Sequence, residues 1–380
     1  MITAEVIWDP GSLDDYEDAW DAVFRLRSHE PSVSFAWSRA LLRHHVKAHD
    51  RAALVVLRDR ERPCGFVPLV VERGAVFGLP LATVMPLSER YNTHGDLLLS
   101  SIDSDVVVAF VDALFALDER WDVFRMGRLH EGSALVESLE RELARRRVSF
   151  RSRVEPPSFV LRLPASVDEY LAERSGKLRN FVRRAEKKLA ARGHVSFRLA
   201  GDGLDVETAY RALLDIEARS WKHGHGTAIS AVEHQHGFYG QLSREMAGTG
   251  ALHLSLLFVD DRPVAYHLGL VFDRTYSCLK TSFDEAFRAL SPATVARARL
   301  IADLIARGMS TFDFPGEPYE WEAQWTSEVT WHRSLLVFNR SVRGRAWSVV
   351  HRLREAWRGR PLEGTIEYVD PKSLKAPDSP

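Results

Sequence analysis

The feature that most constrains the fold is a break at Glu155-Pro156-Pro157, near the middle of the chain. Two adjacent prolines lack the backbone N–H groups that a helix or a central strand needs, so neither element is expected to run through them. The 380 residues are also more than one ordinary core accommodates. We therefore predict a first domain over residues 1–155, a second domain over residues 156–340, and a basic helical tail with a disordered end over residues 341–380.

The first half alternates between helical and strand patterns. Apolar residues at helical spacing predict helices over residues 13–27, 106–117 and 134–147. Two apolar runs within residues 52–71, separated by a charged turn, predict a hairpin, and residues 123–126 are expected to form a strand.

The second half repeats this order of patterns. A helix is expected over residues 167–189, divided near Ser175-Gly176, and a hairpin over residues 252–271. After the hairpin we expect a strand, a helix and a further strand, at residues 275–281, 294–307 and 311–314. Because helices and strands alternate in both halves, we predict an α/β fold with a mixed sheet in each of two tandem domains.

Composition excludes several classes of protein. With a net charge of −1, the chain has no overall field that attracts nucleic acid or a membrane, so such a partner needs a local patch. The chain does not start with a basic segment and an apolar run, and no apolar stretch reaches the about 18 residues of a spanning helix. Cys64 and Cys278 lie far apart and suit a reducing compartment. We expect a cytoplasmic, bacterial-type protein without a transmembrane segment.

A helix start follows a strand pattern at Ser291-Pro292-Ala293. Serine is a good N-cap and proline suits the first helical turn, so free N–H groups and the positive end of the helix dipole are expected to form a cradle for pyrophosphate. An ordinary capped helix is the alternative. The residues expected to bind a phosphorylated cofactor here are Arg288, Ser291, Ala293, Thr294 and Arg297.

Polar side chains follow the last of these strands, in the loop at residues 312–321. Such a loop lies at the end of a sheet, where α/β proteins tend to bind ligands. A carboxylate there can take a proton from an attacking amine, and a tyrosine hydroxyl can return one to a leaving thiolate. We predict that the catalytic residues are among Asp284, Asp313, Glu317 and Tyr319. The alternative is a turn whose tryptophans pack onto the core.

The segment Arg174–Arg192 is strongly basic. One stripe of apolar residues keeps helical spacing and is expected to be buried, while the opposite face carries lysines and arginines against the single acid Glu186. On that face Lys177 and Arg179 are expected to contact the phosphorylated cofactor. The face also suits a tRNA backbone or an anionic membrane surface. A solvated helix face is the alternative.

Histidines recur as His223 and His225, and again as His234 and His236. Imidazoles are good zinc ligands, but no cysteine or carboxylate completes a familiar spacing with these pairs. We therefore predict no metal, and interpret this segment as a mobile loop over the substrate cleft. His267 suits a general base by its ordinary pKa, although a strand residue with a satisfied imidazole is the favoured interpretation.

Taken together, the second half resembles the GNAT superfamily, the general-control-related N-acetyltransferases. Within it, the similarity is to a branch with two such domains, which includes CelD-like acetyltransferases of cellulose biosynthesis and Fem-type aminoacyltransferases. The resemblance covers about residues 159–331 and rests on four segments in order: SGKLRNFVRRAEKKL, DDRPVAYHLGLVF, DEAFRALSPATVARARLIADLIARGMSTFDF and PGEPYEWEAQW. The first half resembles the family's N-terminal domain more weakly.

The resemblance implies an acyltransferase that uses acyl-CoA, commonly acetyl-CoA, without a metal. The acyl group would pass directly to an amine or hydroxyl of a small molecule, a sugar or an envelope polysaccharide. Ala293 stands where the branch commonly has glycine, and Glu320 where it tends to have lysine. Two alternatives stay open: a Fem-type transferase that uses aminoacyl-tRNA on a cell-wall precursor, and a non-catalytic GNAT-like binding module.

Overall fold

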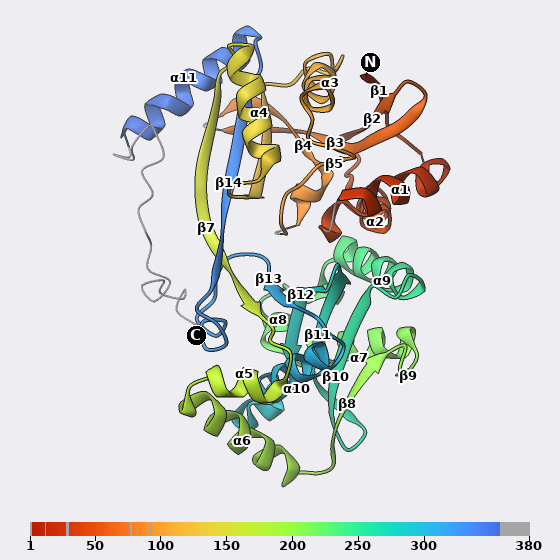
Figure 1. The fold of residues 1–380 in the computed structure, drawn as a ribbon, viewed down its shortest axis with the longest axis vertical. Helices are drawn as coiled ribbons and strands as arrows, with labels where there is room; N and C mark the ends of the chain where they lie inside the picture. The colour runs from red at the N-terminus through yellow and green to blue at the C-terminus, as the bar shows by residue number, and fades with distance from the viewer. Residues whose placement is uncertain (1, 12, 28–29, 77, 92, 358–380) are drawn as a thin grey trace. The chain divides into compact units, whose positions relative to one another are not determined.

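The structure, a computed structural model, describes residues 2–11, 13–27, 30–76, 78–91 and 93–357 (Figure 1). It divides the chain into two compact units. Of the described residues, unit 1 holds those up to Pro157 and those from Thr330 to Trp357, and unit 2 holds Ser158–Val329. The end that we expected to be disordered, residues 358–380, lies outside the described residues. Within the described ranges, every helix is too short or too polar to cross a membrane.

Unit 1 is built on a mixed sheet. Its strands follow the order β1-β2-β3-β4-β6-β14, with the short β5 beside β3, and the parallel pair is β4 with β6. Apolar side chains of these strands form a core with α3 and α4. The strands are β1 (Ile2–Trp8), β2 (Arg51–Asp59), β3 (Arg62–Val76), β4 (Leu79–Pro86), β5 (Leu98–Leu99), β6 (Val123–His130) and β14 (Val329–Phe338). The helices are α1 (Glu17–Arg27), α2 (Phe35–His45), α3 (Ser104–Phe115), α4 (Ala134–Arg145) and α11 (Val342–Trp357).

The strands of unit 2 follow the order β7-β13-β12-β11-β10-β8-β9, again with mixed directions. Its strands are β7 (Phe150–Arg162), β8 (Val195–Ala200), β9 (Gly203–Leu204), β10 (Leu252–Val259), β11 (Arg262–Phe272), β12 (Thr275–Phe283) and β13 (Thr311–Phe314). Its helices are α5 (Val167–Glu173), α6 (Gly176–Ala190), α7 (Val206–Ala218), α8 (Trp221–Gly224), α9 (Glu233–Gly248) and α10 (Pro292–Ala306). The mixed α/β class predicted from the sequence is confirmed.

Helices cover both faces of the unit 2 sheet. Adjacent residues of a strand point to opposite faces. On β11, Tyr266 bonds to Glu217 of α7, whereas His267 lies on the side of Arg297 of α10. Helices α7 and α9 therefore pack on one face and α10 on the other, where α6 runs beside α10. This arrangement gives the sheet two chemically different sides.

The prolines near the middle of the chain do not end a strand, and this expectation was wrong. Strand β7 runs through Pro156 and Pro157. The boundary between the units nevertheless falls directly after Pro157. The pairing of β7 with β13 starts beyond the prolines, at Phe159, so their missing N–H groups remove no bond from that ladder.

The end of the second half also differs from the expected arrangement. Residues 330–340 were expected in the second domain, but β14 pairs with β6, from His332 opposite His130 to Phe338 opposite Val123. The chain therefore returns to unit 1 before it forms α11. The division of helix 167–189 near Ser175 is as expected, because Ser175 accepts a hydrogen bond from the N–H of Leu178 and starts α6.

Candidate active site

The strands β12 and β13 part in the middle of the unit 2 sheet. They pair in parallel over three residues only, from Thr275 with Thr311 to Ser277 with Asp313. Beyond Ser277, β12 continues to Phe283 beside β11, with a register shift at Gly269 opposite Cys278. A bulge of this kind turns the strand and frees backbone groups from the ladder. The described sheet therefore has an opening on one edge of β12, next to a bulge.

The turn before α10 follows the end of β12, where Val295 of α10 packs with Ala265, the β11 partner of Phe283. Ser291 has a left-handed backbone (φ 54°), and its side chain makes no cap hydrogen bond, unlike the N-cap that we predicted. The N–H groups of Thr294 and Val295 point to the Ser291 carbonyl oxygen at 3.2 and 3.4 Å, and Pro292 has none. In the described first turn, Ala293 therefore offers the N–H group that can meet an anion. The positive end of the dipole of this 15-residue helix adds to the attraction between the Ala293 N–H and an anion.

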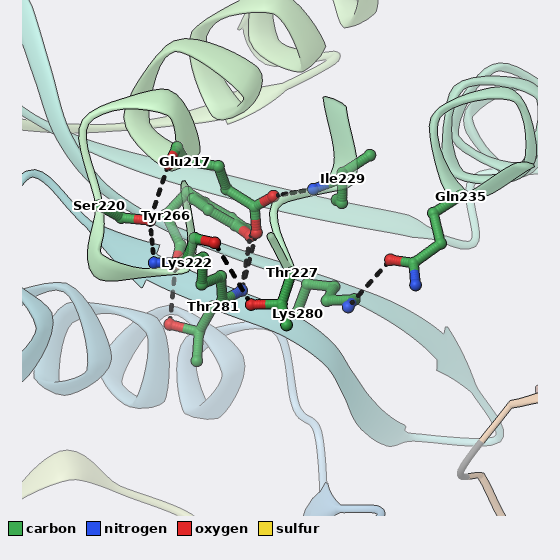
Figure 2. Close-up of polar contacts among 9 residues, drawn as sticks. All are labelled: Glu217, Ser220, Lys222, Thr227, Ile229, Gln235, Tyr266, Lys280 and Thr281. Atoms are coloured by element: carbon green, nitrogen blue, oxygen red, sulfur yellow. Dashed lines mark hydrogen bonds and ion pairs between the residues drawn. The ribbon is translucent and has the colours of Figure 1, made fainter. Parts of the chain in front are cut away.

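A buried polar network lies on the α7 face of β11 (Figure 2). Glu217 of α7 and Tyr266 of β11 are fully buried. Lys222 Nζ donates to Glu217 Oε1 at 2.7 Å, and the Tyr266 hydroxyl donates to the same oxygen. The N–H of Ile229 donates to Glu217 Oε2 at 2.6 Å. Both carboxylate oxygens are thus occupied, so Glu217 holds α8 and the segment after it in place and is not available as a base.

Lys280 lies beside this network on β12, at the bulge (Figure 2). Its Nζ is 3.5 Å from Oε1 of Gln235 in α9 and 5.5 Å from the ring centre of Tyr239. Burial, and then the charge of Lys222, lower the pKa of Lys280 to about 8, while Glu217 acts in the opposite direction. A lysine with this pKa is partly neutral near physiological pH and can accept a proton. Lys280 was not among the residues predicted from the sequence.

The loop after β13 contributes the other titratable groups. Asp313 is buried on β13, whereas Tyr319 is 49% exposed and stacks on Trp321. Burial, and then the charges of Glu317 and Glu322, raise the pKa of Tyr319. Glu317 itself is exposed. Of the predicted catalytic residues, Asp313 thus lies near the end of β13, and Glu317 and Tyr319 lie in the loop that follows it.

Asp284 stands apart from the other predicted catalytic residues. It is buried, and its Oδ2 accepts hydrogen bonds from Arg219 at 2.8 Å and from Arg262 at 2.6 Å. Burial alone raises the pKa of Asp284, but these hydrogen bonds outweigh it and hold the pKa below its usual value. Its Oδ1 accepts the N–H of Ala286 and starts the short helix before Ser291. Asp284 therefore shapes the turn, and a carboxylate held by two guanidinium groups is poorly suited to accept a proton.

The predicted cofactor-binding cations are scattered. Arg288 is exposed and pairs with Glu285 at 2.6 Å. Arg297 is buried, 3.8 Å from the ring centre of Trp321, and burial lowers its pKa to about 10. Arg297 lies over the rings of Trp321 and Trp325, and it follows Ser291 by more than one turn of α10. It therefore lies under the tryptophans and not at the turn.

Lys177 and Arg179 also lie away from Ser291. They flank Leu178, which shares a core cluster with the second half of α10, including Leu304. Ala185, farther along α6, shares a cluster with Val295 near the start of α10. The two helices therefore run antiparallel, and the start of α6 is next to the end of α10. Both cations are exposed there.

The histidines chosen from sequence do not gather. His223 and His225 are exposed on and just after the short α8, and His234 and His236 lie in the first turn of α9. Among the described residues, the group able to hold a metal ion is a different one, in unit 1. The segment that carries the four histidines is folded, and Gln235, between His234 and His236 in α9, contacts Lys280. The imidazole of His267 is buried with no hydrogen-bond partner in the described structure for either ring nitrogen, so it is not the satisfied side chain that we expected.

Comparison with known proteins now identifies unit 2. The family model described as Acetyltransferase (GNAT) domain matches residues 176–323. Unit 2 is a GNAT acetyltransferase domain. This domain supports an acyltransferase enzyme, as the resemblance implied. No curated protein matches the chain significantly.

Solved structures of other proteins share the fold over most of the chain. The chain is similar to a conserved protein of unknown function from Bacteroides thetaiotaomicron (13% identity, TM-score 0.55, 89% of this chain and 100% of that one). It is also similar to FemX (11% identity, TM-score 0.53, 87% of this chain and 96% of that one). A further similar structure is the C-terminal domain of a proposed lysylphosphatidylglycerol synthetase from Agrobacterium fabrum (13% identity, TM-score 0.51, 90% of this chain and 97% of that one). At these identities the likeness shows the fold alone.

In unit 1 a parallel pair of strands separates in a similar way, but a segment of unit 1 itself pairs with the strand edge that this exposes. β4 and β6 pair in parallel over Thr83 and Val84, and β4 ends at Pro86. Farther along β6, Gly95 forms a parallel bridge with Leu129, and its N–H donates to the Arg128 carbonyl at 3.0 Å. A side chain at position 95 would lie 2.2 Å from the Gly127 carbonyl oxygen, so only glycine fits. The edge that is open in the GNAT domain is thus covered in unit 1.

Proposed function

We propose that the GNAT domain transfers an acyl group, acetyl in the simplest case, from acyl-CoA to an amine or hydroxyl acceptor. A small molecule, a sugar or an envelope polysaccharide in the cytoplasm is the proposed acceptor. The parting of β12 and β13 beside the start of α10 carries this proposal, because it offers a donor both an exposed strand edge and a helix terminus. The two cysteines are free and buried, which is compatible with a reducing compartment.

The donor pyrophosphate is proposed to rest on the turn at Ser291, with the Ala293 N–H and the helix dipole as its partners. Ser291 and Thr294 line the same turn and are half-buried. The predicted contributions of Arg297, Lys177 and Arg179 are not part of this proposal, because burial or distance along α10 separates them from the turn. The pantetheine arm would then follow the free edge of β12 toward the bulge.

Lys280 is the proposed proton acceptor. The acceptor's nitrogen or oxygen attacks the thioester carbonyl, the new C–N or C–O bond forms as the C–S bond breaks, and the acceptor's proton passes to Lys280 Nζ. The hydroxyl of Tyr319 is the proposed proton donor to the leaving thiolate. A thiol intermediate is not proposed, since burial raises the pKa of Cys278 to about 12 and little thiolate is available.

The exposed cations of α6 favour an anionic partner for the same domain. Besides Lys177 and Arg179, the exposed face carries Arg183, Arg184, Lys187 and Lys188. Such a face suits an anionic acceptor, a lipid surface or the backbone of a charged tRNA. Aminoacyl-tRNA is therefore included as an alternative donor in any screen.

A pH profile of Lys280 variants tests the assignment. Release of CoA thiol from acetyl-CoA, with the best acceptor from a panel of amines and amino sugars, should increase with pH through about 8 and then level off. Lys280→Met should lower kcat/KM at least about 100-fold and flatten the profile. Lys280→Arg should be equally impaired, because its guanidinium does not release a proton.

Lys47→Met, at an exposed lysine of unit 1, is the matched control and should leave the profile unchanged. If Lys280→Arg keeps the activity, or if activity falls above pH 8, Lys280 binds an anion and is not the base.

A further inference from the structure

Three histidines that are far apart in sequence converge in unit 1. His130 of β6 and His332 of β14 are direct partners in the antiparallel register, so their side chains share one face. His94 reaches them because the next residue, Gly95, bridges to Leu129 of β6. The His94 carbonyl is fixed from the other side by the Ser32 hydroxyl at 2.9 Å. Backbone pairing and a buried hydrogen bond thus hold all three positions.

The spacing of the imidazoles suits a shared ion. One ring nitrogen from each lies within 4.8 Å of the others. The ring centres are 4.5, 4.9 and 5.5 Å apart, and the planes are tilted by 31–49°, so no two rings are stacked. Three imidazoles bound to one Zn²⁺ at about 2.0–2.1 Å in tetrahedral directions have ring centres about 5 Å apart. Small side-chain rotations would therefore bring all three nitrogens into ligand distance.

The surroundings provide what a histidine site needs beyond its ligands. His94 and His332 are buried, and His130 is half-buried. His130 Nε2 is 2.9 Å from Oε1 of Glu30, which leaves Nδ1 of this ring to face an ion. A carboxylate behind a ligating histidine orients the ring and increases its basicity. Arg128 adds a positive charge near His332, and the Glu30 carboxylate beside His130 adds a negative one.

We propose that His94, His130 and His332 bind a divalent transition-metal ion, Zn²⁺ under ordinary conditions, with Glu30 positioning His130. Three imidazole ligands and no thiolate favour zinc and its neighbours in the first row over magnesium or calcium. The ion would tie β6, β14 and the segment around Gly95 together, and so hold in place the segment that covers the strand edge in unit 1. This role is structural and does not rest on the proposed acyl transfer.

The test uses the full chain stripped with a chelator and then titrated with Zn²⁺ alone. Calorimetry should give one site per chain, and Co²⁺ in its place should give the intense visible absorption of a tetrahedral site. At free Zn²⁺ a hundredfold above the Kd, Tm should increase by about 5–10 °C. His130→Asn should abolish this site, and Glu30→Gln should weaken it about 10–100-fold.

The control removes the exposed pair instead, as His223→Asn together with His225→Asn, and should leave stoichiometry and Tm shift unchanged. His130 is half-buried, so its variant is expected to fold, and its Tm without metal checks this directly. His332→Asn provides a second test from another strand. The proposal is overturned if Zn²⁺ binding is absent, survives both His130→Asn and His332→Asn, or disappears in the double control variant.

Discussion

At the scale of single residues, Glu217 determines how the polar side of the GNAT domain is built. Burial by itself raises the pKa of Glu217, but the charge of Lys222 and the hydrogen bonds from Ile229, Lys222 and Tyr266 outweigh it and hold the pKa below its usual value of 4.5. A folded-state pKa below the unfolded one means that the charged carboxylate stabilises the fold above pH 4.5. This contribution is lost as the pH falls through the lower, folded-state value.

Removal of either charge of this pair should be costly. We expect Glu217→Gln and Lys222→Met each to reduce the free energy of unfolding at pH 7 by about 3–5 kcal/mol, because each leaves the other charge buried and alone. The double variant should lose less than the sum of the two. Urea denaturation of all four proteins measures this, and the deficit of Glu217→Gln should shrink in acid. Additive losses would contradict the pairing.

The residues of this network were not predicted from sequence, for a physical reason. Glu217, Tyr266 and Lys280 lie on one helix and two strands, and only the register of β11 with β12 and the packing of α7 bring them together. A weak signal was present, since Lys280 interrupts a strand of mostly apolar and small residues. Asp313 and Tyr319, by contrast, were predicted from the order of strand and loop along the chain, and the structure keeps that order.

At the scale of elements, the bulge in β12 depends on Gly269 of β11. A Cβ atom there would lie 2.4 Å from ring carbons of Tyr276 and 2.6 Å from the Ser277 carbonyl oxygen. Glycine therefore lets the two strands approach closely where the register shifts.

Gly269→Ala should separate the strands at the bulge and reduce stability by about 1–3 kcal/mol. It should also weaken acetyl-CoA binding, since the edge of β12 would move. The matched control is Gly248→Ala at the end of α9, where an added methyl group meets open space. Chemical denaturation measures the change in stability, and a titration with acetyl-CoA measures the change in binding. An unchanged free energy of unfolding for Gly269→Ala would contradict the close approach.

Local patterns predicted many of the elements but missed α9, β14 and the passage of β7 through the prolines. Helix α9 contains Gly237, Gly240 and Gly248 and begins with polar residues, so packing of Phe238 and Leu242 decides its formation rather than propensity. Strand β14 follows a long loop and was assigned to the wrong half. Strand β7 continues through two prolines because its ladder with β13 starts after them.

At the scale of the whole molecule, two units of similar strand order differ at one strand edge. In both, a parallel strand pair parts beside a strand end. Unit 1 closes this edge with its own segment around Gly95, whereas the GNAT domain leaves it free. The number of units was predictable from length and from the prolines. Whether the strand edge in unit 1 or the one in the GNAT domain is open depends on pairing between residues far apart in sequence, which a local sequence pattern does not predict.

The central claim is that the chain binds one acyl donor, at the turn before α10 in the GNAT domain. Calorimetric titration of the full chain with acetyl-CoA tests it most directly. We expect one molecule per chain, and no binding to Ala293→Glu, because a carboxylate at the turn repels pyrophosphate. A glutamate in the first helical turn suits the dipole, so the variant should keep its Tm.

The matched control is Ala172→Glu, the same substitution at an exposed position of α5 in the same unit, and it should bind as the unaltered chain does. Two molecules of acetyl-CoA per chain, or undiminished affinity in Ala293→Glu, would contradict the account.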